Sequence, residues 1–173
     1  MAYQFTSYTP SNIATQKRSL INAVDFSDDP LKEIREKALL HQAISYASNN
    51  STQLYSLKDT TGILKGILGY VALSASEVMI NDIKKPAVLI DLLFVNNKYR
   101  SKTYEHFENL KISELLLEYA GAEFYNVRQH IGVSYLILYP ERGRENKNLV
   151  AFYESMGFTY ATKKHEWMYI KLS

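Results

Sequence analysis

The sequence has no cysteine among its 173 residues. A chain without cysteine forms no disulfide, offers no thiolate to a metal and has no thiol nucleophile. This absence argues against a small secreted domain held together by disulfides.

Long apolar runs are also absent. A helix that crosses a bilayer needs roughly 20 consecutive apolar residues, and no run in this sequence approaches that length. Residues 1–5 lack the basic and apolar segments of a secretory signal. We therefore expect a cytoplasmic protein with no membrane partner.

Neither sign of charge dominates the chain. Twenty lysines and arginines face 18 acidic residues, for a net charge of +2, so nothing at whole-chain level demands nucleic acid as a partner. The four histidines stand far apart without a His-x-x-x-His pair, which argues against a metal site: they are His41, His106, His130 and His165. No Gly-x-Ser-x-Gly elbow or complete phosphate-binding Walker motif occurs.

The length and the 46% hydrophobic content suit one globular domain over residues 1–173. Hydrophobic periodicity and turn residues predict the following order of elements. A strand at 3–8 is followed by helices at 13–24 and 31–47 and by strands at 53–57, 63–75 and 87–95. A long helix then runs from between 101 and 109 to about 129 and leads to a strand at 133–138. A short helix follows Asn146, and 159–162 and 167–172 form a closing hairpin. On the second helix, we expect Leu31, Ile34, Ala38 and Leu39 on the buried face.

The segment 132–158 carries the most specific pattern. An apolar strand leads through a polar loop to Asn146, a suitable N-cap, and Gly157 stands where a left-handed C-terminal cap would end the helix. Between them, apolar and aromatic residues recur at helical spacing, at Leu149, Phe152, Tyr153 and Met156. By spacing alone, any amphipathic helix packed on a sheet would fit.

This segment resembles the C-terminal motif of the GNAT N-acetyltransferase superfamily. The matching positions are Asn146, Leu149, Tyr153, Gly157 and Phe158. The order of the predicted elements is also that of a GNAT fold. The resemblance implies an α/β (α+β) fold, with a mixed, mostly antiparallel sheet flanked by helices, whose splayed central strands form a cleft for acyl-coenzyme A.

The turn after the strand at 87–95 departs from the family pattern. Val95, Tyr99 and Arg100 match, but the family's glycines are replaced by Ser101, Lys102, Thr103 and Tyr104. Glycine eases the close approach of backbone to phosphate. Either side chains of residues 100–102 grip phosphate at an unchanged turn, or residues 102–108 are an insertion and the helix starts near 109–113.

The resemblance implies roles for several residues. Arg100, Ser101, Lys102 and Thr103 would contact the coenzyme A pyrophosphate. The backbone of Phe94 and Val95 would pair with the pantetheine amides. Asn146 would contact the pantetheine arm or order its loop.

Two further residues are candidates for catalysis. Asp91 lies on the central strand at the position of the family's usual base, where it would act directly or through water; the alternative is a structural carboxylate. Tyr153 corresponds to the family's general acid toward the departing thiolate; the alternative is an aromatic core residue.

The resemblance predicts an N-acetyltransferase that uses acetyl-CoA as cosubstrate and no metal. A primary amine on a small molecule or a protein would attack the thioester directly. Charged transfer RNA also occurs as an acceptor in this fold, and nucleic acid is otherwise not expected as a partner. The side chains of Arg142 and Arg144 are interpreted as solvated or as recognising an acidic group of the substrate. The alternative is a degenerate GNAT-like binding or assembly module without activity. A homodimer is the first expectation for the oligomeric state.

Overall fold

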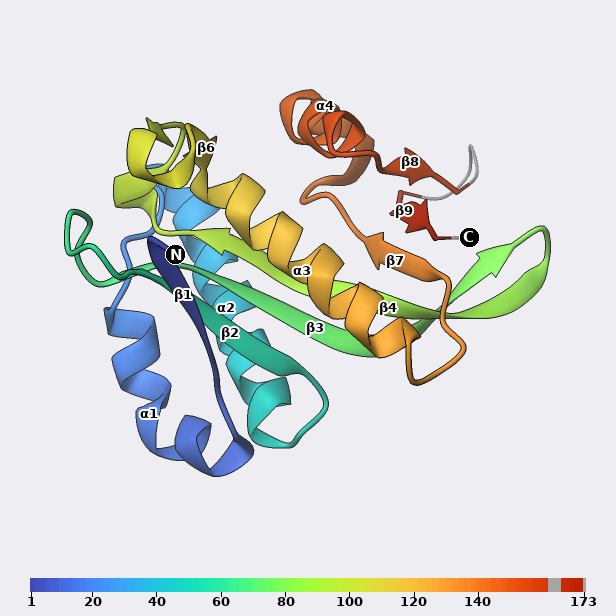
Figure 1. Cartoon of the computed structure of the whole chain (residues 1–173), viewed down its shortest axis with the longest axis horizontal. Coiled ribbons are helices and arrows are strands. Elements are labelled where there is room, and N and C mark those ends of the chain that lie inside the picture. Colours follow the sequence, from blue (N-terminus) through green and yellow to red (C-terminus); the bar gives the residue numbers. More distant parts are fainter. Residues whose placement is uncertain (162–165, 173) are drawn as a thin grey trace. The chain divides into compact units, whose positions relative to one another are not determined.

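A computed structural model describes residues 1–161 and 166–172 of the chain. Figure 1 shows its helices, α1 (Pro10–Asn22), α2 (Pro30–Ser48), α3 (Ile112–Arg128) and α4 (Lys147–Ser155), and the single turns η1 (Asn97–Tyr99), η2 (Glu105–Phe107) and η3 (Gly143–Glu145). The strands are β1 (Tyr3–Ser7), β2 (Gln53–Asp59), β3 (Ile67–Ile80), β4 (Ile83–Val95), β5 (Thr103–Tyr104), β6 (Leu110–Lys111), β7 (Tyr135–Leu138), β8 (Thr159–Tyr160) and β9 (Met168–Lys171). No helix in the described ranges is long and apolar enough to cross a membrane.

Seven strands form one mixed sheet in the order β1-β2-β3-β4-β7-β9-β8, and β5 and β6 form a separate antiparallel pair. The pairs β1–β2, β2–β3, β7–β9 and β8–β9 are antiparallel, whereas β4 and β7 are parallel. The predicted mostly antiparallel sheet is therefore confirmed, with the apolar strand β4 at its centre. The expected end of the closing hairpin's first strand, Thr162, lies outside the described residues.

The chain divides into two compact units by its internal contacts. Unit 1 comprises Met1–Leu73 and Asp91–Ala120, and unit 2 comprises Ser74–Ile90 and Gly121–Ser173. Strands β3 and β4 and helix α3 contribute residues to both. The single domain over residues 1–173 stays a prediction.

Helix α1 begins earlier than the sequence pattern predicts. Residues 9–12, which lie between the predicted strand and the predicted helix, form the start of the helix. Pro10 occupies its first turn, and the Thr9 side chain accepts a hydrogen bond from the Asn12 amide at 3.3 Å. Proline suits this position since the first helical N–H groups have no partner within the helix. The predicted start at Ile13 is therefore wrong.

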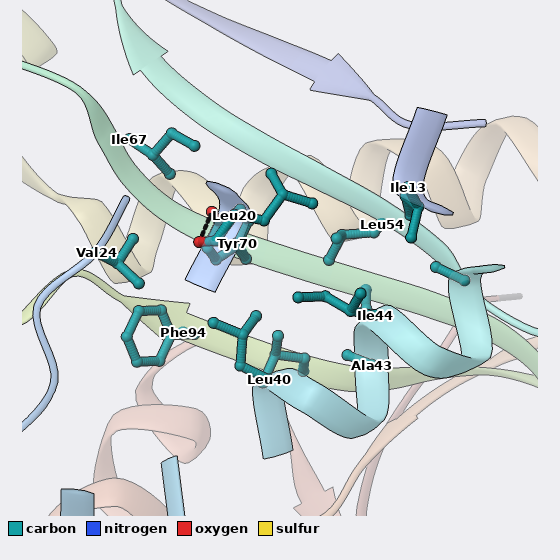
Figure 2. Packing of buried hydrophobic residues seen from close by; sticks show 13 residues of the cluster. Ile13, Leu20, Val24, Leu40, Ala43, Ile44, Leu54, Ile67, Tyr70 and Phe94 are labelled. Atoms are coloured by element: carbon teal, nitrogen blue, oxygen red, sulfur yellow. Dashed lines mark hydrogen bonds between the residues drawn. The ribbon is translucent and has the colours of Figure 1, made fainter. Parts of the chain in front are cut away.

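The core of unit 1 gathers side chains from α1, α2 and the sheet (Figure 2). Leu20 of α1, Leu40 and Ile44 of α2 and Tyr70 of β3 are at most 3% exposed. The Tyr70 hydroxyl donates a 2.6 Å hydrogen bond to the Leu20 carbonyl, so its one polar group is satisfied within the core.

The buried face of α2 differs from the predicted one. Leu31, Ile34 and Leu39 are 69%, 65% and 40% exposed, and Ala38 is also exposed. The residues that face inward are Glu36, Leu40, Ala43, Ile44 and Ala47. Because α2 carries apolar residues on both of these stripes, only its contact with the sheet decides which stripe is buried.

Unit 2 has a smaller core around β7. Tyr135 and Ile137 pack with Val78, Ala87 and Trp167. The hairpin between β3 and β4 turns at Asn81 and Asp82, both with positive φ. The expected helix after Asn146 and the strand at 133–138 are confirmed as α4 and β7.

Between β4 and α3, the chain inserts a small structure made of β5, η2 and β6. Its apolar centre is Phe107, which is 2% exposed and contacts the ring of Tyr3 edge-on at 5.7 Å. His106 lies 2.9 Å from the Asp59 carboxylate at the end of β2. The ring contact of Phe107 with Tyr3 and the polar contact of His106 with Asp59 both join this insertion to the sheet of unit 1.

Asp59 is the polar anchor of that contact. Its side chain is shielded from solvent, and burial raises the pKa of a carboxyl group. Hydrogen bonds from the Thr61 hydroxyl, the Leu64 and Thr61 amides and His106 outweigh burial and lower the Asp59 pKa from 3.8 to about 2. The ionised form is therefore the one that the fold stabilises.

This environment predicts a pH-dependent effect of Asp59→Asn. A carboxyl whose pKa is depressed by folding stabilises the protein fully above 3.8 and loses that contribution as the pH falls toward 2. Asp59→Asn should lower the melting temperature by several degrees at pH 7, and the difference from wild type should shrink between about pH 4 and pH 2. Denaturation series across this range measure it.

Asp82→Asn is the matched control, because it removes an exposed carboxylate from a turn where asparagine is well tolerated. It should leave the melting temperature nearly unchanged. A constant difference between Asp59→Asn and wild type at all pH values would contradict the assignment.

Candidate active site

The predicted site residues fall into two groups, one in each unit. Unit 1 holds Asp91 and the residues around the end of β4, which are Phe94, Val95, Arg100, Ser101, Lys102 and Thr103. Unit 2 holds Asn146 and Tyr153, at the start and toward the end of α4.

Strand β4 continues beyond its pairing with β7. The parallel register joins Ala87–Ile90 to Tyr135–Leu138 and stops there, while β4 runs on to Val95. The edge of β4 from Asp91 to Val95 is thus not paired with β7, and the Val95 carbonyl accepts a hydrogen bond from Arg100 Nε instead.

Gly69 sets the position of the β4 backbone in this part of unit 1. A Cβ atom at residue 69 would lie 2.5 Å from the Phe94 carbonyl oxygen and 2.9 Å from Leu116 of α3. Real Cβ atoms essentially never make contacts that short. Only glycine lets β3 pass so close to the Phe94 carbonyl.

The turn after β4 is held by a buried asparagine. Asn96 is 4% exposed; its side chain donates to the Ile67 carbonyl at 2.8 Å and accepts from the amides of Asp25 and Lys98 at 3.0 and 3.3 Å. The Tyr99 hydroxyl donates to the Lys65 carbonyl at 2.6 Å. These bonds fix η1 against the β2–β3 loop and the α1–α2 loop.

Arg100 is engaged by the protein itself. Its guanidinium lies 2.6 Å from Glu36 Oε2, its Nε donates to the Val95 carbonyl at 2.8 Å, and it stacks over the Phe94 ring at 5.3 Å. Glu36 also accepts a hydrogen bond from the Ser27 amide at 2.7 Å. Phosphate binding by Arg100 stays a prediction, and in this structure its charge is already compensated.

Ser101 adopts the backbone conformation that the family's glycine would favour. Its φ is +60°, in the left-handed region that L-residues other than glycine seldom occupy. Lys102 follows it, exposed and without a partner among the described residues, and Thr103 begins β5. The turn thus keeps a glycine-like shape without a glycine.

The structure decides between the two sequence-based alternatives for this turn. Helix α3 begins at Ile112 rather than directly after Lys102, so the intervening residues are an insertion. A turn that leads straight into the helix is therefore excluded, whereas phosphate binding by the side chains of residues 100–102 stays a prediction. Two consecutive positive-φ residues, Glu108 and Asn109, turn the insertion back toward α3.

Asp91 lies on β4, half-buried. One of its carboxylate oxygens accepts a 2.7 Å hydrogen bond from the hydroxyl of Thr52, which is buried just before β2. Among the described residues no second donor contacts this carboxylate, so its other oxygen can take a proton or a water.

The loop before α4 is closed by Asn146. Its side chain accepts from the Leu149 amide at 3.4 Å and donates to the Glu141 carbonyl at 3.2 Å, so the predicted N-cap is confirmed. Gly143 has φ +59°, and a Cβ there would fall 2.2 Å from the Glu166 carboxylate. At the other end, Gly157 has φ +97°, as the sequence predicted for the helix stop.

Tyr153 is 6% exposed and packs edge-on against Phe158, with ring centroids 5.9 Å apart. Burial raises the pKa of its phenol, and the nearby Glu141 carboxylate raises it further. The hydroxyl therefore keeps its proton at neutral pH. No described residue accepts a hydrogen bond from it.

Sequence reasoning missed Glu36 and Thr52, which hold two of the predicted site residues. A signal was present, because Glu36 lies four residues before Leu40 on the buried stripe of α2. Nothing in the sequence marks Thr52.

Among the described residues, no group of three or more His, Asp or Glu could hold a metal ion.

No protein-family model matches the sequence, and no protein of curated function matches it either. Solved structures do match the fold. One is an AtaT mutant toxin bound to the C-terminus of the antitoxin AtaR and acetyl-CoA, with a TM-score of 0.68, 13% identity and coverage of 98% of this chain and 92% of that chain. Another is a KacT mutant, with a TM-score of 0.66, 14% identity and coverage of 99% and 95%.

A third is a GNAT family acetyltransferase from Brucella melitensis in complex with acetyl-CoA, with a TM-score of 0.59, 13% identity and coverage of 99% and 88%. At 13 to 14% identity, what this chain shares with these three structures is the arrangement of the backbone. The chain has the fold of the GNAT acetyltransferases.

Proposed function

We propose that the chain is an acetyl-CoA-dependent N-acetyltransferase that acts on a primary amine. The observation that carries this proposal is the edge of β4 from Asp91 to Val95, which is not paired with β7. The pantetheine arm of coenzyme A carries two amides, and such an edge supplies the backbone donors and acceptors that they need. Acetyl-CoA in two of the fold's neighbours supports the same cosubstrate here.

The reaction requires one bond to form and one to break. The amine nitrogen attacks the thioester carbonyl, and the C–S bond breaks as the tetrahedral intermediate collapses to the amide and the coenzyme thiolate. We assign Asp91 the proton that leaves the amine, directly or through water, and Tyr153 the proton that reaches the thiolate. Tyr153 has a phenolic hydroxyl that can supply this proton, and burial together with the Glu141 carboxylate keeps it protonated before transfer by raising its pKa.

The phosphates of the coenzyme would be held without glycines. The left-handed Ser101 turns the backbone as a glycine would, and Lys102, which has no partner among the described residues, supplies positive charge beside it. Thr103 would add a hydroxyl, and Arg100 would remain bound to the Glu36 carboxylate and to the Val95 carbonyl. Asn146 would order the loop before α4.

The acceptor is an amine on a small molecule or a protein. AtaT was solved with the C-terminus of an antitoxin, and KacT appears in a complex called KacTA–DNA. A protein partner is therefore a reasonable candidate for this chain as well. A homodimer also stays a proposal.

The rival proposal is a GNAT-like binding module without activity, which the missing glycines and the insertion favour. Thermal denaturation with coenzyme A separates the two, since a ligand at about a hundredfold over its Kd adds about 2.7 kcal/mol. Thiol release from acetyl-CoA over a panel of primary amines then tests catalysis. A stabilising shift with thiol release from an amine would support the enzyme. No shift at millimolar coenzyme A and no thiol release from any amine would favour the binding module.

Lys102 provides the first prediction. Lys102→Glu should weaken coenzyme A binding by about tenfold or more, because it places negative charge next to the proposed pyrophosphate position. Lys98→Glu is the matched control, since the Lys98 ammonium lies 5.4 Å over the Tyr99 ring. Calorimetric titration measures both, and equal small effects would remove Lys102 from the phosphate site.

Tyr153 provides the second prediction. Tyr153→Phe keeps the ring and its contact with Phe158 but removes the proton donor, so kcat should fall by about 10- to 100-fold or more. The melting temperature should change little, because no described residue bonds the hydroxyl. Full activity with a lowered melting temperature would assign the phenol a structural role instead.

Asp91 provides the third prediction. Asp91→Asn retains an oxygen that can accept from Thr52, so folding and coenzyme binding should persist. The rise of kcat/KM with pH, which a base produces, should flatten. A pH–rate profile tests this, and an unchanged profile and rate would exclude Asp91 from proton transfer.

A further inference from the structure

The outer surface of α1 carries positive charge that nothing in the described structure compensates. The helix includes Lys17 and Arg18 and no acidic residue; the first acid of the chain is Asp25. Neither of these cations, nor His41 of the neighbouring α2, forms an ion pair with a described residue. On α2, in contrast, Glu33 bonds Lys37 and Glu36 bonds Arg100.

These three basic side chains surround one groove between α1 and α2 in unit 1. Its volume is about 490 Å³, and Thr15, Ala14 and Ile21 share its walls with them. Solvated helices usually interleave charges of both signs. A groove with cations at its rim and apolar atoms within it is instead suited to bind a group that is both acidic and apolar.

Helix α2 contributes His41 to the lining of the groove, and exposed apolar residues precede His41 on the same face of the helix. Ile34, Ala38 and His41 are spaced by four and three residues, so they share one face of the helix. Leu31 extends this face by a further turn, and Leu31 and Ile34 are each about two-thirds exposed, at 69% and 65%. Groove and stripe thus form one surface, which we call the α1–α2 surface.

We propose that the α1–α2 surface binds an acidic amphipathic helical segment of a partner protein. Carboxylates on such a segment would meet Lys17, Arg18 and His41, and its apolar side chains would cover Leu31 and Ile34. Nucleic acid fits less well, because phosphate recognition draws on several lysines and arginines and has no use for the apolar stripe. The proposal is independent of acetyl transfer.

Fluorescence anisotropy with a labelled peptide of about 15 residues, glutamates on one helical face and leucines on the other, tests the proposal. The peptide should bind the full chain, and affinity should fall as salt rises from about 0.1 M to about 1 M, where the Debye length shrinks from about 10 Å to about 3 Å. Lys17→Glu with Arg18→Glu should weaken binding at least about tenfold. Ile34→Ser should weaken it too.

Lys58→Glu is the matched control, an exposed lysine on β2 with the same change of charge. It should leave peptide affinity unchanged, and all variants should keep the wild-type melting temperature. Failure of the peptide to bind, or equal effects of Lys58→Glu, would overturn the proposal. So would polyglutamate binding as tightly as the amphipathic peptide, or an RNA duplex binding more tightly and losing affinity to the same variants.

Discussion

A buried ion pair connects the helical layer of unit 1 to the turn that follows β4. Glu36 on α2 binds the Arg100 guanidinium, and Arg100 in turn donates to the Val95 carbonyl at the end of the strand. Breaking such a pair by removing one partner typically costs about 3 to 5 kcal/mol, because the other charge stays buried without compensation. The position of the turn therefore depends on Glu36, which precedes Arg100 by 64 positions in the sequence.

This ion pair changes how the turn would hold a coenzyme. With the arginine compensated, Lys102 supplies an exposed positive charge without an ion-pair partner among the described residues, and the backbone shape comes from the left-handed Ser101. The positive end of α3 begins only at Ile112, after the insertion. Because the field of a helix terminus falls off within its first turn, the helix contributes most to anion binding at that point and less at the turn.

In unit 2, glycine and asparagine residues fix the conformation of the backbone around α4. Gly143 admits the Glu166 carboxylate against the backbone, Asn146 caps the helix, and Gly157 ends it in a left-handed conformation. Tyr153 is thereby held on a helix that is defined at both ends, with its ring buried and its hydroxyl protonated. The cap at Asn146 and the stop at Gly157 follow local sequence rules, whereas the contact of Gly143 with Glu166 joins residues far apart in sequence.

The contrast between the two units separates what the sequence determined from what tertiary structure decided. Caps, turns and periodicity act over a few residues, so the order of elements, the apolar β4 and the α4 motif with Asn146 and Gly157 were predictable. The start of α1 was missed because Thr-Pro-Ser-Asn fits a turn as well as a helix cap. The buried face of α2, the bond from Thr52 to Asp91 and the commitment of Arg100 to Glu36 join residues far apart in sequence. No local pattern encodes such pairs, since each depends on which surfaces the folded sheet brings into contact.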